Sequence, residues 1–483
     1  MRLSFILRRD GQLRRRALSD VINNLLSGIN LDDIAQGILP DFFSWIPNTD
    51  RIQSELRISD DAVNSLPVKV LNMPAYANWS DNAWNVRFHA WAYKEPFAFD
   101  NDSSIVTTST LDRAANVFLP DFDVSELQPN EQTNARNLTS AILSLPVDGQ
   151  QLEFHLKVRP GQNSTSALSP WTGRVVWPVE TDARGEIDGF VSVPIEPTGG
   201  TGTWLPDGSQ VSDIVQLDMH TQGTDTGNST VYLVPPEGVI VLSDIDDILR
   251  VTKIYQPTEG LLNSFARDFV PWMNMPQRFA EWKAQYPDQP YHFHYLTTTP
   301  QQATRKYAEF IYNTYPLGSF DTRPLNFTTV EQTFAVRKFL LERILRTFPR
   351  RRFVLIGDTT NSDVMSGYPE VAKAYANVQC ILLRNVSATD SANRFPYDTS
   401  GFNGLDRAKY MFFRTPDDLA GLDFGSGDCV NTTVPQSVTF GWQNLPLGVR
   451  DQTTSDGGGS SKAAVEKVWW VVMVAAVALW STL

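Results

Sequence analysis

Four short apolar runs in the second half of the chain alternate with longer stretches of helical periodicity. The runs are Val239–Ser243, His292–Leu296, Phe353–Ile356 and Val378–Leu383. Continuous runs of this kind are typical of strands that are covered on both faces. Their alternation with helices predicts a parallel sheet between two helical layers. We therefore expect residues 237–430 to form an α/β domain with a doubly wound parallel sheet.

Residues 66–236 follow a different pattern, with short segments rich in β-branched and aromatic residues. Val86–Tyr93 and Leu152–Val158 are two of these segments, and turn residues such as Pro206-Asp-Gly-Ser209 separate them. A helical period persists only around Glu126–Ser144. This alternation predicts a β-sandwich-like domain. The sequence does not indicate which ligand or protein this domain binds.

The two ends of the chain differ from both domains. Residues 1–65 carry five arginines between Arg8 and Arg16. These arginines indicate either the solvated first turns of a basic helix or a propeptide cleavage site that follows a truncated secretion signal. Residues 431–483 form a Ser/Thr/Gly-rich linker that ends in the apolar block Val468–Leu483. Small residues, a polar spacer and an apolar tail are the layout of a GPI-attachment signal. We expect a membrane-associated protein of the secretory pathway or cell surface; a tail-anchored cytosolic protein is the alternative.

Glycosylation sequons favour the secretory location. Asn-x-Ser/Thr occurs at eight positions, and exposure to the lumen would make them usable: Asn78, Asn101, Asn137, Asn163, Asn228, Asn326, Asn385 and Asn431. The two cysteines, Cys380 and Cys429, are too few for a four-Cys metal site but can form one disulfide in an oxidising compartment. The net charge of −13 argues against a nucleic-acid partner.

Polar side chains follow the predicted strands of the α/β domain at one edge of the sheet. Ligands of doubly wound sheets bind at this edge, where the strands have their carboxyl ends. The side chains in question are Asp244 and Asp246, Thr297 and Thr298, Asp358 and Asp363, with Lys338 on the predicted helix Val330–Phe348. Carboxylates from neighbouring strand ends make an oxygen-only site that suits Mg²⁺.

This set of residues can hydrolyse a phosphomonoester. One carboxylate can attack phosphorus and form an aspartyl-phosphate. A second carboxyl can protonate the leaving oxygen and then activate water. A hydroxyl and an ammonium group can donate to the phosphate oxygens.

The ordered set has the pattern of the haloacid-dehalogenase-like phosphohydrolases, and residues ~231–415 more narrowly resemble the actin-patch-associated phosphatidate phosphatase family. The segments that carry the resemblance are Val234-Pro-Pro-Glu-Gly-Val-Ile-Val-Leu-Ser-Asp-Ile-Asp-Asp247, Met275-Pro-Gln-Arg-Phe279, Phe293-His-Tyr-Leu-Thr-Thr-Thr-Pro300 and Phe348-Pro-x3-Phe-Val-Leu-Ile-Gly-Asp358. The resemblance implies a haloacid-dehalogenase-like fold, dependence on Mg²⁺, and hydrolysis of phosphatidate to diacylglycerol.

The resemblance also implies a role for each site residue. Asp244 would be the nucleophile and Asp246 the acid/base, while the phosphate would be bound by Thr297, Thr298 and Lys338. Asp358 and Asp363 would hold the metal together with Asp244 and Asp246. Phe269, Trp272 and Met273 are candidates for an apolar segment at the mouth of the site.

Two other functions remain open. One is hydrolysis of a different phosphomonoester, such as a phosphosugar. The other is a catalytically weak surface protein that keeps the fold while the β-rich domain binds a partner. The presence of Asp244, Asp246, Lys338 and Asp358 speaks against this second alternative.

Overall fold

The computed structural model describes residues 58–96, 108–119, 122–159, 173–196, 205–285, 291–324, 330–390 and 399–436. The arginine-rich N-terminus and the C-terminal apolar block lie outside these ranges. Within the described ranges, no helix combines the length and the apolar character needed to cross a bilayer.

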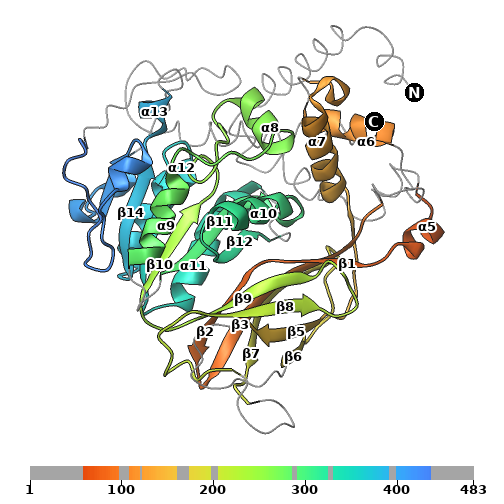
Figure 1. Ribbon diagram of the computed structural model, residues 1–483, viewed down its shortest axis with the longest axis horizontal. Coiled ribbons are helices and arrows are strands. Elements are labelled where there is room, and N and C mark those ends of the chain that lie inside the picture. The colour runs from red at the N-terminus through yellow and green to blue at the C-terminus, as the bar shows by residue number, and fades with distance from the viewer. Residues whose placement is uncertain are drawn as a thin grey trace.

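The first sheet comes from the β-rich part of the chain (Figure 1). Among the described residues it has nine strands in the order β1-β3-β2-β9-β8-β5-β6, with β4 and β7 also paired to β3. Only β2 and β9 pair in parallel. The strands are β1 Lys69–Asn72, β2 Ala75–Ser80, β3 Ala83–Lys94, β4 Leu145–Pro146, β5 Glu153–Val158, β6 Gly173–Val176, β7 Glu186–Val193, β8 Val215–Thr221 and β9 Asn228–Val234.

This sheet curls over its own apolar core. Phe88 on β3 and Phe154 on β5 are not on neighbouring strands, yet their ring centroids lie 4.6 Å apart. Trp177, directly after β6, packs 6.0 Å from Phe88. Near the other end of the sheet, a Cβ atom on Gly189 of β7 would lie 3.1 Å from Trp177. The strands therefore form one continuous bent sheet, and two separate sandwich sheets are not confirmed.

The second sheet has six strands in the order β12-β11-β10-β13-β14-β15 within the described residues. All its pairs are parallel, which confirms the predicted α/β class. The strands are β10 Val239–Asp244, β11 His292–Pro300, β12 Ser319–Arg323, β13 Arg352–Asp358, β14 Val378–Arg384 and β15 Tyr410–Phe413. The strand order reverses between β10 and β13, so a crevice is expected outside the ends of these two strands.

Helices cover both faces of this parallel sheet. Val241 packs with α9 and α10, whereas its neighbours Ile240 and Leu242 pack with α11 and α12 on the opposite face. The α-helices are α5 Asp60–Ser65, α6 Thr108–Phe118, α7 Pro129–Ile142, α8 Pro257–Phe265, α9 Met275–Gln285, α10 Arg305–Thr314, α11 Val330–Thr347, α12 Ser362–Ala374 and α13 Val386–Thr389. The 3₁₀ helices are η2 Val124–Glu126, η3 Gln301–Ala303, η4 Ser400–Phe402, η5 Arg407–Lys409 and η6 Pro416–Leu419.

A helical pair from the first part of the chain packs beside the parallel sheet. α6 and α7 are inserted between β3 and β4 and approach α8 (Figure 1). The rings of Phe118 and Phe265 stack at 5.3 Å, and the Asn134 amide donates to Asp268 at 2.7 Å. Because α8 follows β10, this pair lies at the carboxyl end of the parallel sheet.

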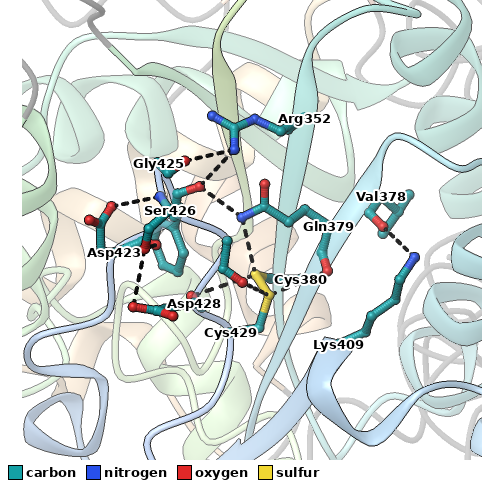
Figure 2. The surroundings of a disulfide bond; sticks show 12 residues. Arg352, Val378, Gln379, Cys380, Lys409, Asp423, Gly425, Ser426, Asp428 and Cys429 are labelled. Atoms are coloured by element: carbon teal, nitrogen blue, oxygen red, sulfur yellow. Dashed lines mark hydrogen bonds between the residues drawn. A yellow bond between two sulfur atoms is a disulfide. The ribbon is translucent and has the colours of Figure 1, made fainter.

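A disulfide joins Cys380 on β14 to Cys429, with 5.3 Å between the Cα atoms (Figure 2). This resolves the pairing that the sequence left open. The Gln379 amide and Arg352 hold the same segment by donating to its backbone carbonyls. Farther along, the Gln436 amide bonds both to the Phe412 N–H at 2.9 Å and to the Phe412 carbonyl at 3.1 Å. The C-terminal segment is thus fastened along β14 and β15.

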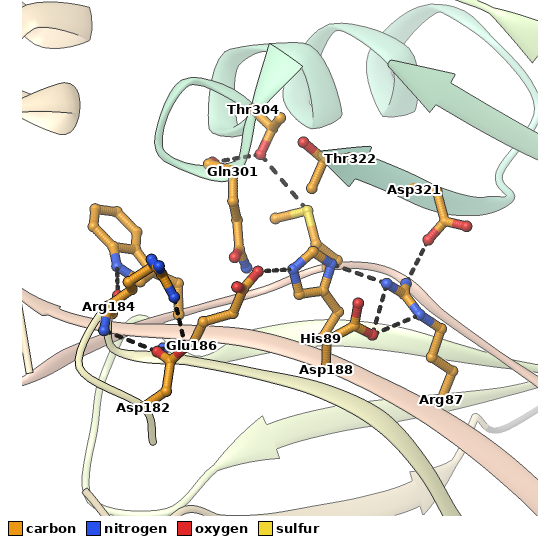
Figure 3. A network of polar contacts seen from close by, with 12 residues as sticks. Arg87, His89, Asp182, Arg184, Glu186, Asp188, Gln301, Thr304, Asp321 and Thr322 are labelled. Atoms are coloured by element: carbon orange, nitrogen blue, oxygen red, sulfur yellow. Dashed lines mark hydrogen bonds and ion pairs between the residues drawn. The ribbon is translucent and has the colours of Figure 1, made fainter. Parts of the chain in front are cut away.

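Buried charges connect the two sheets (Figure 3). Arg87 on β3 pairs with Asp188 on β7 at 2.9 Å and with Asp321 on β12 at 2.5 Å. Arg343 on α11 pairs with the same two carboxylates at 2.8 and 3.2 Å. The Phe320 N–H adds a bond of 2.9 Å to the Pro74 carbonyl. The β-rich part and the parallel sheet are therefore tied together by long-range polar contacts.

This network predicts how stability depends on pH. Burial opposes ionisation of Asp188, but Arg87 and Arg343 outweigh it and lower the pKa of Asp188 to about 2. A carboxyl with a lowered folded pKa adds stability above its unfolded pKa of roughly 4, and this stability is lost as the pH falls toward 2. Asp188→Asn should cost about 3–5 kcal/mol at pH 7, because it leaves buried arginines less well paired.

Urea unfolding at pH 7, 4 and 3 tests this expectation. The variant should lose stability less steeply than the wild type as the pH falls. Asp218→Asn is the matched control, because the Asp218 carboxylate is half-exposed in its pair with Arg159 and exposed pairs contribute little. An unchanged pH slope in Asp188→Asn would contradict the role assigned to the network.

Candidate active site

Asp244 is the last residue of β10 and is buried, with 2% of its surface exposed. Its Oδ1 accepts the Ile245 N–H at 3.0 Å. Its Oδ2 lies 3.1 Å from Arg337 Nη1 but accepts no hydrogen bond within the described residues. Burial raises the pKa of Asp244 to about 7, with the negative charges of Asp358 and Asp246 adding to the effect and Arg337 opposing it. An ionised Asp244 therefore calls for additional positive charge.

Asp358 ends β13, the strand next to β10. It accepts the Thr360 N–H at 2.6 Å and the Asn361 amide at 2.7 Å. Burial raises the pKa of Asp358 to about 6, and the nearby Asp247 raises it further. The two strand ends thus bring two buried carboxyls together, as the sequence predicted.

Asp363 lies in the first turn of α12 and meets the same arginine as Asp244. Arg337 Nε donates to Asp363 Oδ2 at 2.5 Å. Arg337 therefore bridges a carboxylate on β10 and a carboxylate on α12.

Lys338 does not reach these carboxylates. Its side chain is about half exposed, and its ammonium pairs with Glu370 of α12 at 2.6 Å. Successive helix residues point about 100° apart, so the buried cation beside Asp244 is Arg337 instead. Leu340, Leu341 and Ile344 follow Arg337 at the i+3, i+4 and i+7 positions and are buried. That apolar spacing was the signal in the sequence that placed Arg337 on the inner face.

Thr297 lies within β11 next to the position opposite Asp244, because Asp244 is in register with Leu296. Thr297 is buried, and its hydroxyl donates to the Thr299 hydroxyl at 3.0 Å. Thr298 is half-buried. The structure therefore brings the predicted hydroxyl of Thr297 to the edge that carries the carboxyls.

Asp246 faces a group of side chains that the sequence analysis did not identify. Its Oδ1 lies 2.8 Å from the buried Arg250 and 2.8 Å from the Thr252 hydroxyl. The next residue, Asp247, has a φ of 57°. It accepts the backbone N–H groups of Lys253 at 2.7 Å and Ile254 at 2.9 Å, which fixes the loop that follows β10.

The predicted apolar mouth is smaller than expected. Trp272 is buried, and the Arg384 guanidinium lies 4.0 Å from the centre of its ring. Met273 and Val270 are exposed. Trp272 therefore packs within the domain and leaves these two residues as the apolar surface of this segment.

Two of the four predicted carboxylates are placed so that they could hold Mg²⁺. No three His, Cys, Asp or Glu side chains in the described ranges converge as they would around a metal ion. Asp246 and Asp363 are instead engaged by arginines. Magnesium commonly uses only one or two carboxylates and completes its shell with water and substrate phosphate. Asp244 and Asp358, both buried and both with a pKa raised mainly by that burial, supply such a pair.

Residues 239–385 match the family model of the "Phosphatidate phosphatase APP1, catalytic domain". The Phosphatidate phosphatase APP1 of Saccharomyces cerevisiae is 26% identical over 151 residues, which cover 30% of this chain and 25% of the yeast protein. The match thus spans about a quarter of the length of that curated relative.

A solved carbohydrate esterase structure aligns over 75% of this chain and 91% of its own, at 12% identity and a TM-score of 0.16. That score is too low to indicate a shared fold. The family match does agree with the geometry, because it begins at β10 and extends past the acidic ends of β10 and β13. Residues 239–385 are therefore similar to the catalytic domain of the APP1 phosphatidate phosphatase family, which confirms the resemblance recognised in the motifs.

Proposed function

We propose that the protein is a Mg²⁺-dependent phosphatidate phosphatase-like enzyme that works through an aspartyl-phosphate. The observation that carries this proposal is the buried Asp244, which lies where the strand order reverses, beside Asp358 and Arg337. Asp244 Oδ2 accepts no hydrogen bond from the part of the chain that the structure describes, and such a buried carboxyl is a suitable nucleophile once a cation compensates its charge.

The reaction would proceed in two steps. Asp244 attacks phosphorus, the bond from phosphorus to the leaving oxygen breaks, and Asp246 gives that oxygen its proton. Asp246 then takes a proton from water, which attacks the phosphoryl group and releases phosphate and the Asp244 carboxylate. Arg337 and the Thr297 hydroxyl would donate to the phosphoryl oxygens. A bound Mg²⁺ would supply the positive charge that favours the ionised form of Asp244.

The direct test is a phosphate-release assay on the full chain. Phosphatidate in detergent micelles, glycerol 3-phosphate and glucose 6-phosphate would be compared with Mg²⁺ and with a chelator. We expect Mg²⁺-dependent release with phosphatidate preferred. Preference for a soluble ester would support the alternative phosphatase, and no release from any ester would favour the surface-interaction protein.

We also infer that the protein resides in the secretory pathway, in association with a membrane. The disulfide between Cys380 and Cys429 supports this location, because structural disulfides persist in oxidising compartments. The exposed sequons at Asn137 and Asn228 support it as well. By contrast, the Asn431 amide donates to the Asp418 carbonyl at 3.0 Å, and the side-chain oxygen of Asn385 is buried.

This location predicts which described sequons carry glycans. In a eukaryotic secretory host, Asn137→Gln and Asn228→Gln should each remove the mass of one N-glycan. Asn431→Gln is the matched control and should leave the glycan mass unchanged. Intact-mass spectrometry before and after enzymatic deglycosylation measures this. A secreted chain without a glycan at either Asn137 or Asn228 would contradict the prediction.

A further inference from the structure

Arg250 is a cation buried within the domain and surrounded by partners. Its Cζ lies 3.7 Å from the ring centre of Phe269 and 4.7 Å from that of Tyr307. Its side chain donates to the Asn263 carbonyl at 3.0 Å and to the Tyr307 hydroxyl at 2.9 Å. A planar guanidinium held between two rings and several acceptors has one orientation. That orientation directs Nε to Asp246 at 2.8 Å.

The contacts of Asp246 are unequal at its two oxygens. Oδ1 accepts from Arg250 at 2.8 Å, from the Thr252 hydroxyl at 2.8 Å and from Tyr307 at 3.2 Å. Within the described residues, Oδ2 accepts one longer hydrogen bond, from the Tyr307 hydroxyl at 3.4 Å. One oxygen is therefore occupied by donors, and the other is available to give and take a proton.

We propose that Arg250 is a positioning residue for Asp246: it fixes Oδ1 so that Oδ2 faces the reacting oxygen. This inference rests on the proposed phosphatase function. A buried ion pair contributes little net stability after its desolvation cost. We therefore expect the pair to matter more for the orientation of the Asp246 carboxylate than for the stability of the fold.

The support for Arg250 extends to the helical pair α6 and α7. Phe269, the ring on one side of Arg250, directly follows Asp268. The Asp268 carboxylate accepts from Asn130 at 3.3 Å and from Asn134 at 2.7 Å, both on α7. On the other side, Lys306 Nζ lies 4.7 Å from the Phe269 ring. The N-terminal part of the chain thus holds the ring against which Arg250 is packed.

The leaving group distinguishes positioning from a purely structural role. The alkoxide that leaves from phosphatidate needs a proton in the transition state, whereas p-nitrophenolate leaves without one. A misplaced general acid therefore lowers the rate of phosphatidate hydrolysis more than that of p-nitrophenyl phosphate hydrolysis. The expected difference is about 10²-fold, at the lower end of general acid catalysis. Simple loss of folded protein lowers both activities equally.

The test measures kcat/KM on phosphatidate and on p-nitrophenyl phosphate in Arg250→Gln and Arg250→Lys. For Arg250→Gln we expect kcat/KM on phosphatidate to fall about 10²-fold and kcat/KM on p-nitrophenyl phosphate to change little, because kcat/KM reports the step in which the leaving group departs. The pre-steady-state burst of p-nitrophenolate should be retained, and Arg250→Lys should restore part of the loss. Arg267→Gln is the control, because the neighbouring Arg267 is partly exposed and pairs with Glu259; its kcat/KM should stay at the wild-type value.

Two further variants keep the proposal falsifiable. Phe269→Leu removes the ring but no hydrogen bond, and it should give a smaller loss with the same bias against phosphatidate. Equal losses of kcat/KM on both substrates, or none, in the folded Arg250 or Phe269 variants would overturn the positioning role alone. Near-normal activity of Asp244→Asn would overturn the proposed function, and the inference with it.

Discussion

Asp244→Asn should abolish phosphate release and leave the protein folded. The amide keeps the shape of the side chain but cannot attack phosphorus. Removing a nucleophile costs roughly 5–8 kcal/mol of transition-state stabilisation, at about 1.36 kcal/mol for each factor of ten in rate. Phosphatidate hydrolysis with Mg²⁺ measures the loss. A folded variant with near-normal activity would point to direct attack by water.

The same substitution should stabilise the protein in metal-free buffer at high pH. Burial and neighbouring carboxylates raise the pKa of Asp244 to about 7. A raised carboxyl pKa costs stability that grows as the pH rises from the unfolded value of roughly 4 to about 7. Asp244→Asn should therefore raise the melting temperature at pH 8 and leave it unchanged below pH 4.

Asp246→Asn is the matched comparison for the nucleophile. It removes proton transfer but keeps Asp244, so a substrate with a good leaving group should still phosphorylate Asp244. The expected loss is about 10²–10⁴-fold. Trapping of a phosphorylated chain in this variant, and not in Asp244→Asn, would distinguish the two carboxyls.

The second large effect is expected at Arg337 and not at its neighbour Lys338. Arg337→Gln removes the cation that bridges Asp244 and Asp363. We expect kcat/KM to fall about 10²–10³-fold, as for other donors to transition-state charge. Lys338→Gln removes an exposed pair with Glu370 and should change kcat/KM by less than about two-fold, because such pairs contribute little.

Both variants would be assayed on phosphatidate, with the melting temperature as the check on folding. Arg337→Lys should recover part of the activity, because it restores the charge without the planar fork. The reverse ranking, with Lys338→Gln the poorer enzyme, would return the phosphate-binding role to Lys338. It would leave Arg337 as a structural partner of the two carboxylates.

The acidic edge was predictable because it depends on local sequence and one rule of topology. Apolar runs identified the strands, and Asp244 and Asp358 follow from where those runs end. Residue type and spacing favour Lys338 as the phosphate ligand, but they do not indicate which face of the helix is buried. The buried Leu340, Leu341 and Ile344 on one face of α11 show why Arg337 reaches Asp244 instead.

Other parts of the molecule depend on contacts between distant residues. Arg87 meets Asp321, and Asn134 meets Asp268. No local period encodes such pairs. Likewise, alternation of residues predicts β-strands but cannot distinguish two stacked sheets from one curled sheet. The continuous hydrogen-bonded order of the strands makes that distinction.

The hydrogen bonds made by the Pro74 carbonyl and by the Gln436 side-chain amide have a consequence for the design of shorter fragments of this protein. They cover the outer strands β12 and β15, at the two edges of the parallel sheet. Uncovered edge strands are templates for pairing with other chains and lead to aggregation. A fragment limited to residues 239–385 would lack both covers and β15 itself. We therefore expect the stretch shared with relatives to aggregate when it is produced alone, and fragments meant to stay monomeric should extend from β1 through Gln436.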